Sequence, residues 1–166
     1  MRRSILGMLC ACLFGWSVVL IASQTAWAEI NSSFASFSGR WAGMGTIVPA
    51  TGPSEDFKCV VTYFPSNDGS RVRQNFRCRS ENHKFDVAAL LEIQGGEITG
   101  SWQENTYALN GKVNGSATNE GFVVLLSGEF FQGKMTVISS QCEQSVTLVP
   151  VRVDQMKELA ARLRKC

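Results

Sequence analysis

The cysteine residues have the most clearly defined chemistry in this sequence. Four of the six lie beyond residue 28, namely Cys59, Cys78, Cys142 and Cys166, and none of them forms a Cys-x-x-Cys pair. Zinc binding usually uses such closely spaced thiolates together with histidines, and His83 is the one histidine of the chain. An even number of widely spaced cysteines instead predicts two disulfides, provided that the chain reaches an oxidising compartment.

Residue patterns that indicate catalysis are absent from the sequence. It contains no Ser-His-Asp arrangement, no glycine-rich phosphate loop and no zinc motif. The aspartates and glutamates are scattered, and none of them is among the apolar residues predicted below to point inward. A pair of catalytic carboxylates is the alternative, but we predict a non-enzymatic protein without a cofactor or a metal.

Arginines form a ladder that is suited to anion binding. Arg71, Arg73, Arg77 and Arg79 alternate along the chain, so they share one face of a strand. Lys58 is expected opposite Arg79, and two like charges in that position are unfavourable unless an anion compensates them. The ladder therefore predicts an anion site for lipid headgroups, an acidic polysaccharide or a protein partner. The alternative is an ordinary solvated face that neighbouring strands neutralise.

Aromatic residues provide another candidate site. Those that we expect to point inward are Trp41, Phe57, Tyr63, Phe76, Phe85, Trp102 and Phe122. They predict either a solid core or a pocket for a small apolar ligand, because a small barrel has room for side chains or for one such ligand. In the pocket interpretation, the ligand-binding residues are Trp41, Trp102, Tyr63 and Phe76.

The elements that would position these residues follow an export signal. Arg2 and Arg3 precede an apolar run over residues 5–22, and Ala26-Trp27-Ala28 is typical of a signal-peptidase site. We therefore expect a signal peptide over residues 1–28, which is removed on export. An N-terminal membrane anchor is the alternative.

Removal of this peptide changes the charge of the chain. Two of the 16 basic residues lie in it, which leaves 14 against the 14 acidic residues and a net charge of zero. That balance argues against nucleic acid as a partner. We expect a periplasmic or secreted monomer of one domain with no transmembrane span after cleavage.

The mature sequence is typical of an all-β protein. After a predicted flexible segment over residues 29–36, short runs with period-two apolarity extend over residues 37–152. A turn at Asp68-Gly69 would place Cys59 opposite Cys78, within reach of a disulfide. In the same way, a turn at Gly95-Gly96 would place Ala89 opposite Trp102 and Leu91 opposite Gly100.

The last segment has a different period. Over residues 153–166 the apolar positions Met156, Leu159, Ala160 and Leu163 follow helical spacing, which predicts an amphipathic helix. Such a helix would return Cys166 towards Cys142 for a second disulfide, with an intermolecular bond as the alternative. The predicted fold is therefore a small antiparallel up-and-down β-barrel of about eight strands with a C-terminal α-helix.

Two family resemblances rest on short motifs. Gly39-Arg40-Trp41, with its echo Gly100-Ser101-Trp102, resembles the Gly-x-Trp element of calycin-type barrels such as lipocalins and avidins. This resemblance implies a cup for an apolar ligand. Trp41 followed by Cys59 and Cys78 is similar in order to periplasmic metalloprotease inhibitors, small bacterial barrels. That resemblance implies that Glu29 to Ser36 would enter a protease cleft.

Together these features predict an exported bacterial β-barrel that binds a small apolar ligand or an envelope component. The alternatives are a protein-interaction module, such as a protease inhibitor, and a structural protein of the envelope.

Overall fold

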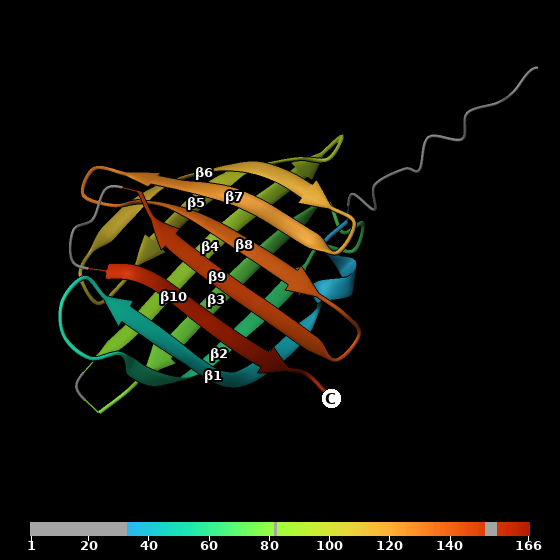
Figure 1. Ribbon diagram of the computed structural model, residues 1–166. Helices are drawn as coiled ribbons and strands as arrows, with labels where there is room; N and C mark the ends of the chain where they lie inside the picture. The colour runs from blue at the N-terminus through green and yellow to red at the C-terminus, as the bar shows by residue number, and fades with distance from the viewer. Residues whose placement is uncertain (1–32, 82, 152–155) are drawn as a thin grey trace, which may run out of the picture.

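The alternating strands close into one antiparallel barrel (Figure 1). A computed structural model describes residues 33–81, 83–151 and 156–166, so the predicted signal peptide lies outside the described residues. A short 3-10 helix, η1 (Ala35–Phe37), precedes the first strand. The strands are β1 (Gly39–Pro49), β2 (Glu55–Pro65), β3 (Arg71–Arg79), β4 (Lys84–Gln94), β5 (Glu97–Glu104), β6 (Leu109–Thr118), β7 (Gly121–Gly128), β8 (Gln132–Ser139), β9 (Glu143–Pro150) and β10 (Met156–Arg164).

Each strand pairs with its neighbours in the sequence, and β1 pairs with β10 to close the ring. The prediction of an all-β, up-and-down barrel is therefore confirmed, whereas the prediction of eight strands is wrong because the described residues form ten. The interior of a barrel widens as strands are added. This number thus decides whether side chains can fill the interior completely.

The predicted C-terminal helix is also wrong, because Met156–Arg164 forms strand β10. Leu159, Ala161 and Leu163 point into the core and alternate with exposed or half-buried residues. The sequence fits both periods, but only a strand can hydrogen-bond to the free edges of β1 and β9. Barrel closure removes those edges, and this tertiary gain exceeds the small differences in helix propensity.

Both predicted hairpin registers and both intramolecular disulfides are confirmed. Cys59 pairs with Cys78 across β2 and β3, and Ala89 pairs with Trp102 across β4 and β5. Cys59–Cys78 and Cys142–Cys166 are bonded. Disulfides are typical of oxidising compartments, in agreement with export. No helix within the described ranges is long and apolar enough to cross a membrane.

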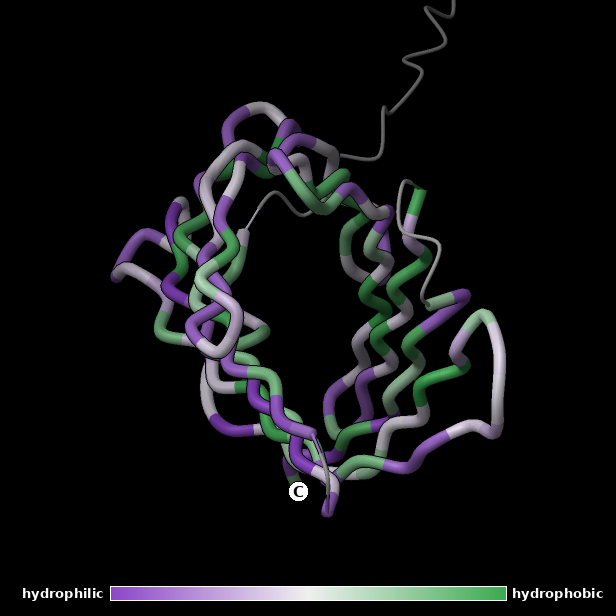
Figure 2. The backbone as a smooth tube through the Cα atoms, turned by 90° about the vertical axis from the view of Figure 1, so that its left-hand side faces the viewer, coloured by the Kyte–Doolittle hydropathy of each residue, from purple (hydrophilic) through white to green (hydrophobic). Residues whose placement is uncertain are grey.

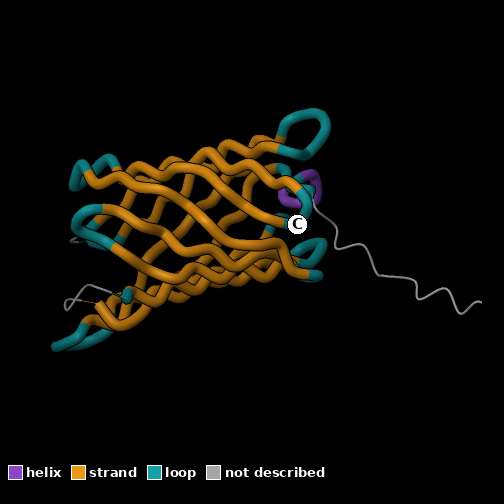
Figure 3. The backbone as a smooth tube through the Cα atoms, turned by 90° about the horizontal axis from the view of Figure 1, so that it is seen from above, coloured by secondary structure: helices purple, strands orange, loops and turns teal. Residues whose placement is uncertain are grey.

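The two ends of the barrel differ. One end, here called the closed end, carries helix η1 and the C-terminus (Figure 3). The turn at residues 66–70 and the Cys142–Cys166 disulfide lie at the same end. The other, the open end, carries the connections from β1 to β2, from β3 to β4, from β5 to β6 and from β7 to β8. Figure 2 views the ring of strands from the open end.

Aromatic side chains pack inside the closed end, and a hollow of about 480 Å³ beside them is lined by Phe34, Phe37 and Phe122. Phe34 and Phe37 are buried, and both rings pack against Phe122 at centroid distances of 6.2 and 5.5 Å. The backbone N–H of Phe34 also donates to the carbonyl of Gly69. Residues 33–36 of the predicted flexible segment are thus packed against the barrel, because burial of Phe34 compensates the entropy lost on ordering them. Residues 29–32 lie outside the described residues.

Candidate functional site

An apolar cavity of about 160 Å³ lies in the half of the barrel nearer the open end. Its walls come from β3 to β10 and from the loops beside them. The lining consists of Gln74, Phe76, Phe85, Val87, Ala89, Leu91, Trp102, Glu104, Tyr107, Leu109, Val113, Leu126, Phe131, Met135, Val146, Leu148, Met156 and Leu159. A cavity of this kind, apolar with few polar groups, is typical of small-molecule sites.

Trp102 is the largest side chain of the wall, and glycines make room for it. A Cβ atom built at Gly111 would lie 2.7 Å from the indole Nε1, and one at Gly128 would lie 3.1 Å from Cζ2. The indole therefore lies against the glycines of β6 and β7. Phe131 meets it edge to face at 5.7 Å. The buried Nε1 has no hydrogen-bond partner among the described residues.

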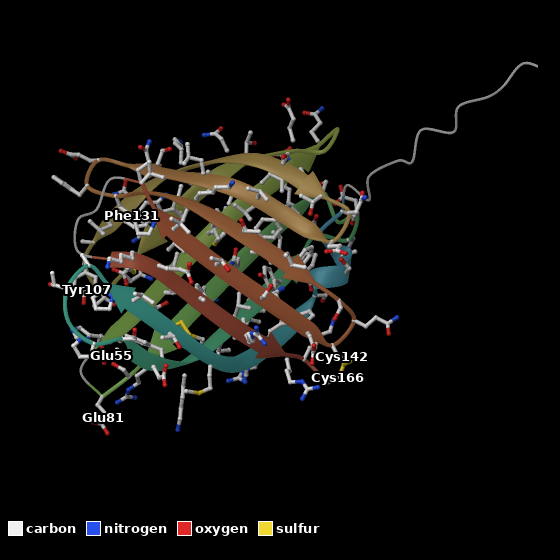
Figure 4. The ribbon with its side chains drawn as sticks, in the orientation of Figure 1. Glu55, Glu81, Tyr107, Phe131, Cys142 and Cys166 are labelled. Atoms are coloured by element: carbon white, nitrogen blue, oxygen red, sulfur yellow. A yellow bond between two sulfur atoms is a disulfide. The ribbon has the colours of Figure 1, made fainter. Side chains whose placement is uncertain are left out.

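The β5–β6 loop at the rim of the cavity is fixed by Glu104. This carboxylate accepts hydrogen bonds from the backbone N–H groups of Asp86 (3.0 Å) and Tyr107 (2.6 Å). Burial by itself raises the pKa of Glu104, but these two backbone bonds and the hydrogen bonds from Thr106 together outweigh it and lower the pKa below its usual value. Tyr107 and Phe131 lie at the opposite end of the barrel from Cys142 and Cys166 (Figure 4). The carboxylate is thus an anchor for the rim.

The structure separates the four predicted ligand-binding residues. Trp102 and Phe76 line the cavity, whereas Trp41 and Tyr63 belong to the packed closed half. Trp41 is 0% exposed and donates from Nε1 to the carbonyl of Phe37 at 2.9 Å. Tyr63 donates its hydroxyl to Oε1 of Gln144 at 3.1 Å, and burial raises its pKa.

The predicted anion-binding residues also separate. Arg71 pairs with Glu92 at 3.6 Å and Arg77 pairs with Asp86 at 3.1 Å. Arg73 lies over the ring of Phe64, 4.4 Å from its centroid. Three of the four arginines therefore already contact side chains of neighbouring strands.

Arg79 has a different environment from the rest of the ladder. It stands between Lys58 and Lys84 in the cross-strand register, and all three are exposed. None of the three forms an ion pair with a carboxylate of the described residues. Lys84 was not among the residues predicted from the sequence.

Several residues of the cavity were missed at the sequence level. Gln74 could have been found, because it interrupts the inward alternation between Val72 and Phe76 with a polar side chain. Tyr107 and Phe131 lie in loops, where no periodicity indicates direction. Met156 and Leu159 were assigned to a helix, and only β10 brings them to the wall.

Titratable side chains form few close groups in the described part of the chain. His83 Nδ1 lies 2.8 Å from Glu55 Oε2 at the open end, where both side chains are partly exposed. No group of three or more His, Cys, Asp or Glu side chains in the described ranges could hold a metal ion.

Comparison with protein families and with curated proteins gives no match for this sequence. The fold is similar to that of the S-type phycobiliprotein lyase CPES from Guillardia theta, with a TM-score of 0.54 and 9% identity. The match covers 82% of this chain and 93% of the lyase. At this identity the likeness shows the fold alone, which is an antiparallel β-barrel.

Proposed function

We propose that this chain is an exported, non-enzymatic binding protein of the cell envelope that holds one small apolar ligand in its barrel. The observation that carries the proposal is the apolar cavity of about 160 Å³ beside Trp102. Empty apolar cavities of roughly 150 Å³ in other proteins stay dry and bind benzene-sized molecules. A ring of that size fits the cavity, and a longer ligand would extend between the loops of the open end.

We also propose that the cavity does not catalyse a reaction of its ligand. Glu104 is the one carboxylate that the described residues contribute to the lining, and its oxygens already accept hydrogen bonds from the backbone. A carboxylate held in that way is a poor proton acceptor for a ligand, because its pKa is lowered. Binding without reaction is therefore the function that these residues support best.

Tryptophan fluorescence tests the proposal. In the exported form, residues 29–166, Trp41 and Trp102 are the two tryptophans. We would titrate the Trp41→Phe variant with butylbenzene and follow the emission of Trp102. The matched control is the Trp102→Phe variant, in which the buried Trp41 reports from the closed end.

We expect a saturable change in the emission of Trp102 and no change in that of Trp41. No saturation at Trp102 up to the solubility limit of the probe, or equal changes in both variants, would contradict the proposal. Native mass spectrometry of protein from its own host would then identify any ligand that remains bound.

A second proposal concerns anions. Lys58, Arg79 and Lys84 form one outward row without ionic partners among the described residues, so this row is the part of the arginine ladder suited to an acidic polysaccharide. We expect the Arg79→Ser/Lys84→Ser variant to elute from immobilised heparin at lower salt than the unmodified chain. Arg71→Ser/Arg77→Ser, which removes the same charge from paired arginines, is the control. Elution of both variants at the same salt concentration would refute anion binding by this row.

A further inference from the structure

The side-chain amide of Gln74 is the unusual feature of the cavity. Gln74 is 4% exposed, and it lines the cavity with apolar neighbours such as Phe76 and Val87. No hydrogen bond of its side-chain amide to another described residue is found. The amide is not among the fully enclosed unpaired side-chain atoms, which are Trp102 Nε1 and Gln144 Nε2, so it borders the free space of the cavity. Polar groups inside proteins are nearly always hydrogen-bonded, because an amide that lacks a partner has lost its hydrogen bonds to water without compensation. A partner from outside the chain would satisfy it.

The strand register places this amide on one side of the space for a ligand. Gln74 pairs with Ala89, and Ala89 pairs with Trp102, so the three residues form one row across β3, β4 and β5. Two strand spacings, about 10 Å, separate the backbones of Gln74 and Trp102. The small side chain of Ala89 leaves the space between them free. A ring above Ala89 would contact the indole with one edge and approach the amide with the other.

The charge of the lining limits what this amide can meet. Among the residues that the structure describes, no Lys, Arg or His lines the cavity, and the Glu104 carboxylate is hydrogen-bonded at the rim. An anionic ligand would therefore lose its hydration without gaining a counter-charge. An amide offers both a donor and an acceptor to a neutral partner. A carbonyl could accept from Nε2, and a hydroxyl could bond to either end.

We propose that the cavity selects uncharged apolar molecules that carry one hydrogen-bonding group, a carbonyl or a hydroxyl, which pairs with the amide of Gln74. This inference rests on the proposed ligand-binding function and names the class of ligand. Ligands of this class are aryl or alkyl ketones and alcohols, as opposed to plain hydrocarbons and carboxylates.

Three probes with ten carbon atoms test the inference by calorimetry: butylbenzene, butyrophenone and 4-phenylbutyrate. The quantity to compare is the selectivity ratio, the Kd of butylbenzene divided by that of butyrophenone. One neutral hydrogen bond corresponds to about a three- to tenfold change in affinity. We therefore expect Gln74→Met to lower the ratio about three- to tenfold. In the unmodified chain, 4-phenylbutyrate should bind at least about tenfold more weakly than butyrophenone.

The matched control is Gln144→Met, the same change at a buried glutamine outside the cavity that accepts the Tyr63 hydroxyl. This variant should keep the selectivity ratio. An unchanged selectivity ratio in Gln74→Met would overturn the inference, and so would 4-phenylbutyrate that binds as tightly as butyrophenone. In either case, binding of butylbenzene would still support the proposed function. If none of the three probes binds, the proposed function itself fails.

A measurement on the unmodified chain makes the test independent of how well Gln74→Met folds. The side-chain amide of Gln74 gives two proton signals in a nitrogen-15 NMR spectrum. Butyrophenone should shift these signals, and butylbenzene should shift them much less. Equal shifts with both probes would refute a hydrogen bond to the amide.

Discussion

Filling the cavity from Ala89 should stabilise the barrel and abolish ligand binding at the same time. Ala89 lies between Gln74 and Trp102 in the register, and its side chain borders the 160 Å³ of free space. Ala89→Leu adds three carbons, which are worth about 0.8 kcal/mol each when buried. Ordering a leucine side chain opposes this by about 0.5–1 kcal/mol. The expected gain in the free energy of unfolding is therefore about 1.5 kcal/mol.

The same substitution in the packed half should have the opposite sign. Ala161 is 3% exposed on β10, and a Cβ at Gly45 would already lie 3.1 Å from its own Cβ. Ala161 does not line the cavity, so a leucine there would overpack the core. Ala161→Leu should therefore lower the free energy of unfolding by about 1–3 kcal/mol. Ala161→Leu thus controls for the bulk of the new side chain.

Urea unfolding followed by circular dichroism measures both free energies, and a butylbenzene titration measures binding. Ala89→Leu should reduce the affinity for butylbenzene more than about tenfold, since the leucine occupies the space of the ring. If Ala89→Leu destabilises the chain as much as Ala161→Leu does, the interior at Ala89 is packed and the reasoning fails. Unchanged butylbenzene affinity in a stabilised Ala89→Leu variant would place the ligand elsewhere.

Three further predictions concern the frame of the barrel. The Cβ of Gly111→Ala would meet the backbone carbonyl of Ser127 and lie 2.7 Å from Trp102 Nε1, so this variant should lower the free energy of urea unfolding by about 1–3 kcal/mol and shift the emission of Trp102. An unchanged emission would contradict the close packing against the indole. Replacement of Cys59 and Cys78 by alanine, which opens a link of sequence separation 19, should lower the same free energy by about 3 kcal/mol. Asp68→Asn should lower the urea midpoint at neutral pH. Hydrogen bonds from Ser66 and Ser70 lower the pKa of Asp68 to about 2, so its contribution is present above about pH 4 and is lost as the pH falls through 2. If the difference in urea midpoint between the Asp68→Asn variant and the unmodified protein stayed constant from pH 7 to pH 2, this account would be contradicted.

The sequence determined the hairpins better than the barrel. Asp68-Gly69 and the Cys59–Cys78 pair are independent signals for one register, and the register is confirmed. Such local signals cannot report how many strands complete the ring, because closure depends on pairing between β1 and β10 at opposite ends of the chain. The segment that forms β10 also has helical spacing, so its period alone could not decide. The strand count and the cavity therefore became visible only with the fold.

The two Gly-x-Trp motifs show why a pocket cannot be assigned from residue types alone. Gly39 and Gly100 precede Trp41 and Trp102 in the same way, and both tryptophans point inward. Near the closed end, helix η1 supplies the carbonyl that binds the indole of Trp41, and Lys165 Nζ lies 4.6 Å from the centroid of its ring.

Around Trp102 no helix of the described residues enters the barrel, and the ring of ten strands is wider than its lining side chains can fill. Its indole N–H has no partner among the described residues, and free space borders its ring. The same motif thus yields a core residue at one end and a wall of the proposed ligand site at the other. Within the described residues, the difference is helix η1, which packs beside Trp41 and not beside Trp102.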